Sequence, residues 1–165
     1  MNEKTERTTL VFASEIDYES VSTLIDLLEE NAHKKIDLYF SSSGGGVSSG
    51  ELLIDYFNFR KLDLTLIANW SINSTAFSVF FKSDCVNRRI MPNTHSTIHL
   101  CRRDISTIDL NRQESYEKFL IDDVDRQNEK DINWFRELGI SKDKIDIIKS
   151  GKDVMLDYED LVELL

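Results

Sequence analysis

Three polar residues, Ser74, His99 and Asp153, stand in sequence contexts that suit acyl-transfer chemistry. Ser74 lies where a polar loop gives way to an apolar run. A serine at such a junction is exposed, and its hydroxyl lies near the N–H groups of a helix N-terminus. A histidine can take the hydroxyl proton, and a carboxylate can orient the imidazole. The residue types are therefore those of a serine–histidine–aspartate triad.

Each of these residues also has a simpler structural interpretation. Ser74 could be the N-cap of the helix that follows it, and Ser71 and Ser78 are alternative nucleophiles. His99 could be a hydrogen-bonded strand residue, and Asp153 a solvated turn residue. From spacing alone, these structural interpretations are favoured over the triad.

A second chemical feature is the segment Lys35–Gly50, KIDLYFSSSGGGVSSG, in which a strand pattern ends in glycines and leads into a helix pattern. Glycine permits positive φ and a close approach of backbone or ligand. Backbone N–H groups before a helix can hold an anion, either a phosphate or the oxyanion of an acyl-transfer intermediate. Gly45 and Gly50 have the spacing of a phosphate-binding loop, but Glu51 stands where that loop needs lysine.

Metal chemistry is a weaker alternative. His95, His99 and Cys101 could lie on one face of a strand, but the sequence offers no clear fourth ligand. An ordinary polar strand face is the simpler interpretation, and we expect neither a metal ion nor another cofactor.

The elements that must position these residues alternate between strands and helices, which favours an α/β fold with a parallel sheet and right-handed crossovers. Apolar residues recur at every second position in the strand candidates and at helical spacing in the helix candidates. The predicted strands are Arg7–Ala13, Lys35–Phe40, Leu62–Ala68, Val86–Met91, Ser96–Cys101 and Asp153–Leu156. The predicted helices are Tyr18–Ala32 capped by Asp17, Val47–Lys61, a short buried helix from Ser74 to Phe81 after a polar loop, Thr107–Leu138 ended by Gly139, one from Ser141 to Lys149, and one from Tyr158.

Composition limits the classes of function. A chain of 165 residues fits one domain, 1–165, with a sizeable core. The net charge of -10 argues against a nucleic-acid partner. Cys85 and Cys101 indicate reduced thiols, and no apolar run approaches a signal core or a membrane span. We therefore expect a cytoplasmic protein without a membrane partner.

Several segments of the chain resemble, in order, those of the proteolytic subunit of Clp protease. YFSSSGGGVSSG resembles the family's YxNSPGGxVxxG, and RTTLVFASEID resembles its first strand and G-x-I-D turn. TLIANWSINSTAF resembles the segment around the family's nucleophile, and MPNTHSTIHL resembles LPN-x-x-x-M-I-H, which ends in the catalytic histidine. GKDVMLDYEDLVELL resembles the segment that carries the catalytic aspartate. The similarity covers nearly the whole chain.

This resemblance implies a ClpP/crotonase-like α/β fold, with a spiral core of repeated β-β-α units and a protruding handle helix. It implies a serine endopeptidase in which Ser74 is the nucleophile, His99 the general base and Asp153 the orienting carboxylate. The backbone N–H groups of Gly45 and Thr75 would form the oxyanion hole. Peptides or unfolded proteins would be the substrates of a homo-oligomeric ring, with an AAA+ ATPase as a further partner.

The chain departs from the family pattern at several positions. Ser43 replaces the turn proline, and Asn73-Ser74-Thr75-Ala76 stands where the family has A-S-M-G or A-S-M-A. The alignment needs one extra residue, so Asn73 could instead occupy the nucleophile position, although the apolar phase of Phe77–Phe81 favours Ser74. A catalytically inactive Clp-fold ring subunit therefore remains an alternative. A crotonase-type acyl-CoA enzyme is the other.

Three further departures concern assembly. Leu100-Cys101-Arg102-Arg103-Asp104 replaces the family's Gln-Pro and glycine-rich strand, and Lys152 replaces an arginine of the ring–ring contact. The family's N-terminal gate segment is short or missing. These changes bear on the double ring, the gate and the ATPase partner more than on the triad.

Overall fold

The computed structural model describes the backbone of residues 6–83, 87–101 and 114–165, and the side chains of these residues except 114–121. The chain forms two compact units. The first runs to Ile98 and includes Met155–Glu163 and Leu165, and the second comprises His99–Val154 and Leu164. None of the described helices is both long and apolar enough to cross a membrane.

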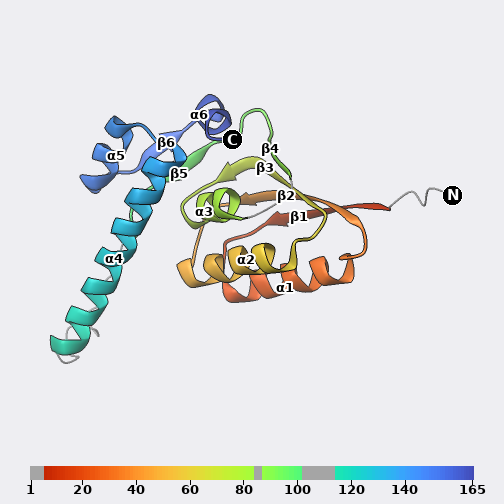
Figure 1. Cartoon of the computed structure of the whole chain (residues 1–165), viewed down its shortest axis with the longest axis horizontal. Helices are drawn as coiled ribbons and strands as arrows, with labels where there is room; N and C mark the ends of the chain where they lie inside the picture. Colours follow the sequence, from red (N-terminus) through yellow and green to blue (C-terminus); the bar gives the residue numbers. More distant parts are fainter. Residues whose placement is uncertain (1–5, 84–86, 102–113) are drawn as a thin grey trace. The chain divides into compact units, whose positions relative to one another are not determined.

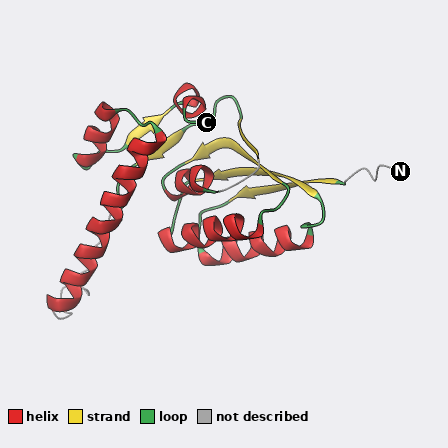
Figure 2. Cartoon of the chain, in the orientation of Figure 1, coloured by secondary structure: helices red, strands yellow, loops and turns green. Residues whose placement is uncertain are grey.

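A four-stranded parallel sheet forms the centre of the first unit (Figure 1), in the order β1-β2-β3-β4. Each crossover moves one strand along in the same direction, so right-handed connections place the intervening helices on one face. Figure 2 shows the same alternation of strand and helix by colour. The strands are β1 Arg7–Ala13, β2 Lys35–Ser42, β3 Leu64–Ile72 and β4 Asn87–Ile90, and the helices are α1 Tyr18–Glu30, α2 Val47–Arg60 and α3 Thr75–Lys82.

The core lies between the sheet and these helices. On β2 the buried residues alternate with half-buried ones, which is the pattern predicted from the sequence. Helix α3 buries Phe77, Val79 and Phe80 completely, and this confirms the prediction of a short buried helix beneath Ser74.

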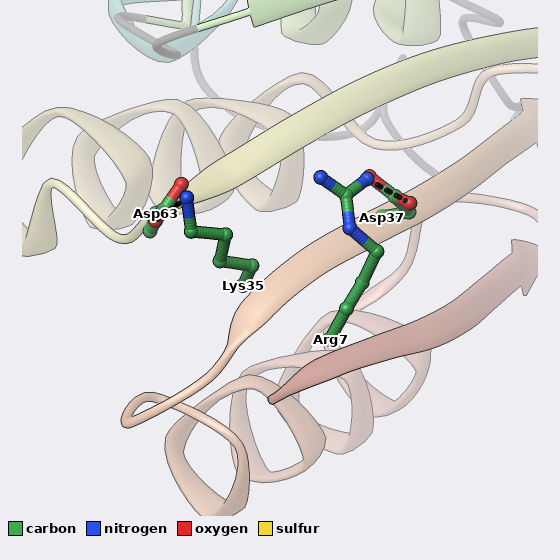
Figure 3. A network of polar contacts seen from close by, with 4 residues as sticks. All are labelled: Arg7, Lys35, Asp37 and Asp63. Carbon is green, nitrogen blue, oxygen red and sulfur yellow. Dashed lines mark hydrogen bonds and ion pairs between the residues drawn. The ribbon is translucent and has the colours of Figure 1, made fainter. Parts of the chain in front are cut away.

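Two ion pairs lie near the amino-terminal ends of the strands (Figure 3). Nη1 of Arg7 donates to both carboxylate oxygens of Asp37, at 2.9 and 2.7 Å, and Nζ of Lys35 lies 3.7 Å from Oδ2 of Asp63. The pairs follow from the strand register, in which Arg7 lies opposite Lys35 and Ile36 opposite Leu64. Arg7, Lys35 and Asp63 are exposed and Asp37 is half-buried, so the Lys35–Asp63 pair in particular contributes little to stability.

Strand β3 differs from its prediction. The sequence suggested a strand over Leu62–Ala68 and a polar loop after it, but the strand continues to Ile72. The register shifts on the way, because Phe40 pairs with Ala68 whereas Ser42 pairs with Ile72. The added residues form a bulge in which Trp70 has φ 66° and points outward. As a result, β2 and β3 end side by side, and the glycine turn and Ser74 leave the sheet at the same edge.

A second, two-stranded sheet pairs β5 (Ser96–Ile98) with β6 (Val154–Leu156), and α6 (Tyr158–Glu163) follows. The prediction that His99 and Cys101 continue the first of these strands is wrong. The partner strand offers only three residues, so the ladder ends at Ile98.

The second unit is helical. Helix α4 runs over Glu114–Leu138, and the predicted residues before Glu114 lie outside the described part of the chain. Gly139, with φ 102°, ends α4 as predicted, because the N–H of Ile140 donates to the carbonyl of Phe135 at 2.9 Å. Helix α5 (Lys142–Lys149) begins at its predicted cap, Ser141.

Candidate active site

Ser74 occupies the turn between β3 and α3 in a strained conformation, with φ 52° and ψ −120°. A non-glycine residue in such a region costs about 1–3 kcal/mol and persists only where its surroundings hold it. Ser74 is the N-cap of α3 by position, but its side chain makes no capping hydrogen bond. In the described part of the chain the Ser74 hydroxyl has no hydrogen-bond partner. It therefore does not cap the helix, which was the structural alternative to a nucleophile.

The glycine turn after β2 lies against this serine. A Cβ atom on Gly44 would be 2.7 Å from the carbonyl oxygen of Asn73 and 2.9 Å from Cβ of Ser74. Gly44 also has φ 99°, so both space and backbone conformation require glycine there. The turn is fixed from its other side, because Ile16 donates to the carbonyl of Gly44 at 2.7 Å and accepts from the N–H of Gly46 at 2.8 Å.

Two backbone N–H groups next to Ser74 are available to a ligand. The carbonyl of Gly45 accepts a hydrogen bond from the Thr75 hydroxyl at 2.9 Å, which ties the glycine turn to the start of α3. The N–H groups of Gly45 and Thr75 themselves donate to no acceptor within the described residues. Thr75 is the first residue of α3, where N–H groups lack helical partners and the helix dipole favours negative charge. Such a pair of donors suits an oxyanion.

The three residues of this arrangement, Gly45, Ser74 and Thr75, all belong to the first unit. The remaining predicted site residues, His99 and Asp153, belong to the second. The structure thus brings the predicted nucleophile together with the predicted oxyanion donors.

His99 is half-buried, and its Nδ1 atom lies 2.8 Å from the carbonyl oxygen of Leu100. A carbonyl oxygen only accepts hydrogen bonds, so this contact requires the hydrogen on Nδ1, and in the neutral imidazole the lone pair is then on Nε2. That tautomer is the one a general base needs. The partner of Nδ1 is the neighbouring main chain and not the carboxylate of Asp153, which is exposed.

The segment after His99 is held by α4. The N–H of Cys101 donates to Oδ1 of Asn128 at 2.9 Å, and Nδ2 of Asn128 donates to the Cys101 carbonyl at 3.4 Å. No sequence pattern predicts this contact, because Asn128 stands among charged residues on a helix. The Asn128 amide forms the hydrogen bonds to the Cys101 main chain that a neighbouring strand would form in a sheet.

The metal alternative gains no support from the described residues. No three of their histidine, cysteine, aspartate and glutamate side chains come together in a way that could hold a metal ion. The ring of His95 contacts Trp70 edge-on, with 6.1 Å between ring centroids.

A parallel α/β unit in which a glycine turn lies against a strained serine is the arrangement expected of a Clp-type fold. The chain belongs to the Clp protease family, whose family model matches residues 5–124. Over 72 residues it is 32% identical to an ATP-dependent Clp protease proteolytic subunit from Paracoccus denitrificans. That stretch is 44% of this chain and 36% of the relative, so the match spans only about a third of the relative's length.

The fold is similar to that of a solved ClpP1 mutant from Listeria monocytogenes. The TM-score is 0.66 and the sequence identity 22%, over 94% of this chain and 86% of that chain. The predicted ClpP/crotonase-like α/β fold is therefore confirmed.

Proposed function

We propose that this chain is a serine-type endopeptidase of the Clp type and that Ser74 is its nucleophile. The observation that carries the proposal is the turn at Ser74: among the described residues, neither the hydroxyl of this strained serine nor the two backbone donors beside it have a hydrogen-bond partner. Family membership supplies the reaction class. The hydrogen-bonded side chain of Asn73 and the positive φ at Ser74 both favour Ser74 over Asn73 as the reactive residue.

In the proposed reaction, Oγ of Ser74 attacks the carbonyl carbon of a peptide bond while Nε2 of His99 takes the hydroxyl proton. The N–H groups of Gly45 and Thr75 hold the oxygen that becomes negative. The carbon–nitrogen bond then breaks, and His99 gives the proton to the leaving amine. Water attacks the resulting ester, returns a proton to Oγ through His99, and releases the acid.

The role of Asp153 and the need for assembly belong to the same proposal. Nδ1 of His99 is bonded to the Leu100 carbonyl in the single chain. We expect the imidazole to exchange this partner for the carboxylate of Asp153 when the chain assembles into a homo-oligomeric ring, which would stabilise the imidazolium. Unfolded proteins or peptides would be the substrates, and an AAA+ ATPase would be a further partner; both follow from the family resemblance.

A catalytically inactive ring subunit is the second candidate. It is favoured by the contact between His99 and Leu100, since a triad histidine is normally oriented by a carboxylate. A crotonase-type enzyme would use the glycine-turn donors on a thioester and would not need Ser74.

Hydrolysis of an unfolded, fluorescently labelled protein separates these candidates. We expect wild-type chain to cleave it, Ser74→Ala to abolish cleavage, and the matched variant Ser71→Ala to retain it. Circular dichroism would check that each variant is folded. A folded wild-type ring without peptidase activity would favour the inactive subunit, and acyl-CoA turnover that survives Ser74→Ala would favour the crotonase-type enzyme.

A further inference from the structure

The side chain of Asn73 forms a bridge that the family pattern does not contain. Its Oδ1 atom accepts a hydrogen bond from the N–H of Thr97 at 2.8 Å. The main-chain N–H of Asn73 donates to the Ser42 carbonyl at 3.0 Å, and its main-chain carbonyl accepts from the N–H of Ala76 at 2.9 Å. Asn73 therefore joins the end of β2, the start of α3 and strand β5 at one point.

The bridge replaces one bond of a regular parallel ladder. Ser71 pairs with His95 in a parallel bridge, and the next pair along would be Asn73 with Thr97. One of the two bonds expected for that pair is present, since the N–H of Ser74 donates to the Thr97 carbonyl at 2.8 Å.

The second bond of that pair is made differently. In a regular ladder the N–H of Thr97 would donate to the carbonyl of Ile72. That carbonyl instead accepts from the buried hydroxyl of Ser96, at 2.5 Å, and the Asn73 amide oxygen takes the Thr97 N–H in its place. Side chains thus complete the ladder where the backbone turns away into the strained conformation of Ser74.

We propose that Asn73 is a positioning residue for Ser74: its amide oxygen holds β5 against the turn, so that Ser74 stays in its strained conformation. This inference rests on the proposed nucleophilic role of Ser74. The bond from the Thr97 N–H to the Asn73 amide oxygen and the bond from the Ser74 N–H to the Thr97 carbonyl meet at Thr97, which precedes His99 by two residues in the chain. The same contact therefore restrains the nucleophile and the strand that leads to the general base. Alanine, which the family resemblance places at this position, could not make it.

The test compares three variants of the full chain by their rate of labelling with a fluorophosphonate probe. Asn73→Ala removes the accepting oxygen, and we expect labelling to slow about 10- to 100-fold, the scale of a small misplacement of a reacting group. Asn73→Asp keeps an oxygen that can accept from Thr97, and should label at close to the wild-type rate. On a peptide substrate the loss in Asn73→Ala should fall on kcat and leave KM nearly unchanged.

The matched control is Thr94→Val. Thr94 is buried and its hydroxyl donates to the Met91 carbonyl at 2.6 Å, away from the Ser74 turn. This variant loses a comparable buried hydrogen bond and should still label like wild type. Equal slowing in Asn73→Ala and Thr94→Val, or no recovery in Asn73→Asp, would overturn the positioning role.

Amide hydrogen exchange tests the hydrogen bond between Asn73 and Thr97 without relying on activity. The Thr97 N–H should exchange slowly in the wild-type chain, and faster in Asn73→Ala but not in Thr94→Val. Fast exchange at Thr97 in wild type would overturn the inference even if Asn73→Ala does not fold. A wild-type chain that resists labelling would reject the proposed function, and slow exchange at Thr97 would then still support the bridge.

Discussion

At the scale of single residues, the conformation of Ser74 depends on close contacts with Gly44 and Asn73. Gly44 lies so close to Asn73 and Ser74 that no larger residue fits, and the Asn73 carbonyl and amide are both engaged. These contacts offset the energetic cost of the positive φ at Ser74. We therefore expect the turn to be rigid and not to change its conformation when a ligand binds.

A pair of glycine substitutions tests this rigidity. Gly44→Ala introduces backbone strain and a clash with the main chain, whereas Gly151→Ala introduces only strain, because its Cβ would meet nothing within 4 Å. We expect Gly151→Ala to lower the free energy of unfolding by about 1–2 kcal/mol, and Gly44→Ala to lower it clearly more and to suppress labelling of Ser74. Urea denaturation measures both. Equal losses would mean that the turn can yield.

Residue chemistry alone could not decide between an N-cap and a nucleophile at Ser74. The two roles share a position at the start of a helix and differ only in φ, ψ and the direction of the hydroxyl. Family resemblance indicated Gly45, Ser74 and Thr75, and the structure places these three together. The bridges made by Asn73 and Asn128 could not be predicted, because an asparagine amide carries no sequence pattern that reveals its partner across the fold.

At the scale of elements, α3 supports the turn from below. Its apolar residues are fully buried, and Gly50 allows α2 to approach it closely, since a Cβ there would lie 2.2 Å from Cγ2 of Thr75. Packing of α3 therefore fixes the direction of its N-terminal N–H groups.

Truncation of a core side chain of α3 should be costly. Phe80 is fully buried, and we expect Phe80→Ala to lower the free energy of unfolding by about 3–5 kcal/mol. Phe59 on α2 is 85% exposed and is the matched control, with a change within about 0.5 kcal/mol. Thermal or urea unfolding of the two variants provides the measurement. Similar effects in both would mean that α3 does not carry the core.

A polar cluster joins α1 to α2 and contributes to the free energy of unfolding in a pH-dependent way. Glu29 accepts from the Tyr56 hydroxyl at 2.9 Å and from Arg60 at 2.6 and 2.7 Å. Burial, followed by the hydrogen bond to Glu29, raises the pKa of Tyr56 to about 12, and the hydrogen bonds from Arg60 and then Tyr56 lower the pKa of Glu29.

The raised pKa of Tyr56 fixes the sign of this effect. The unfolded chain ionises at the ordinary tyrosine value, about 10, before the folded chain does. The stabilisation is therefore complete below that pH and is lost as the pH rises through about 12. Urea midpoints between pH 9 and 12 should fall more steeply for wild type than for Tyr56→Phe. Parallel curves would show that folding does not raise the pKa of Tyr56.

The sequence predicted the elements well where periodicity is strong, and less well where a strand ends irregularly. The bulge in β3 carries no glycine to mark it, and Trp70 takes a positive φ that its residue type does not suggest. The early end of β5 depends on the length of β6, a segment far away in the chain. Both features are tertiary, so a local pattern could not reveal them.

At the scale of the whole molecule, we propose that the function needs more than one copy of the chain. Helix α4 buries Ile132 and Phe135 and leaves other apolar residues, such as Trp134, only half-covered. We propose that neighbouring subunits complete this cover in a single heptamer-like ring or a stack of two. The Asn128 contact makes the segment after His99 depend on α4, so assembly around α4 could act on His99, the proposed general base.

Assembly should therefore accompany activity. Light scattering coupled to size exclusion should show a mass several times the 19.1 kDa of one chain at micromolar concentration. Asn128→Ala should lower peptidase activity more than it lowers the helix content measured by circular dichroism, because it frees the Cys101 main chain. A clean monomer would reject the ring, and a fully active monomer would reject its coupling to catalysis.

The most direct test of the central claim is covalent labelling with a fluorophosphonate probe, with the modified residue identified by mass spectrometry. A single adduct on Ser74 is expected, absent in a folded Ser74→Ala variant and retained in Ser71→Ala. Loss of any one member of the proposed triad should slow the reaction by several orders of magnitude, because the residues of a catalytic triad act as a unit. An adduct on Ser71, or no adduct in any assembly state, would contradict the account.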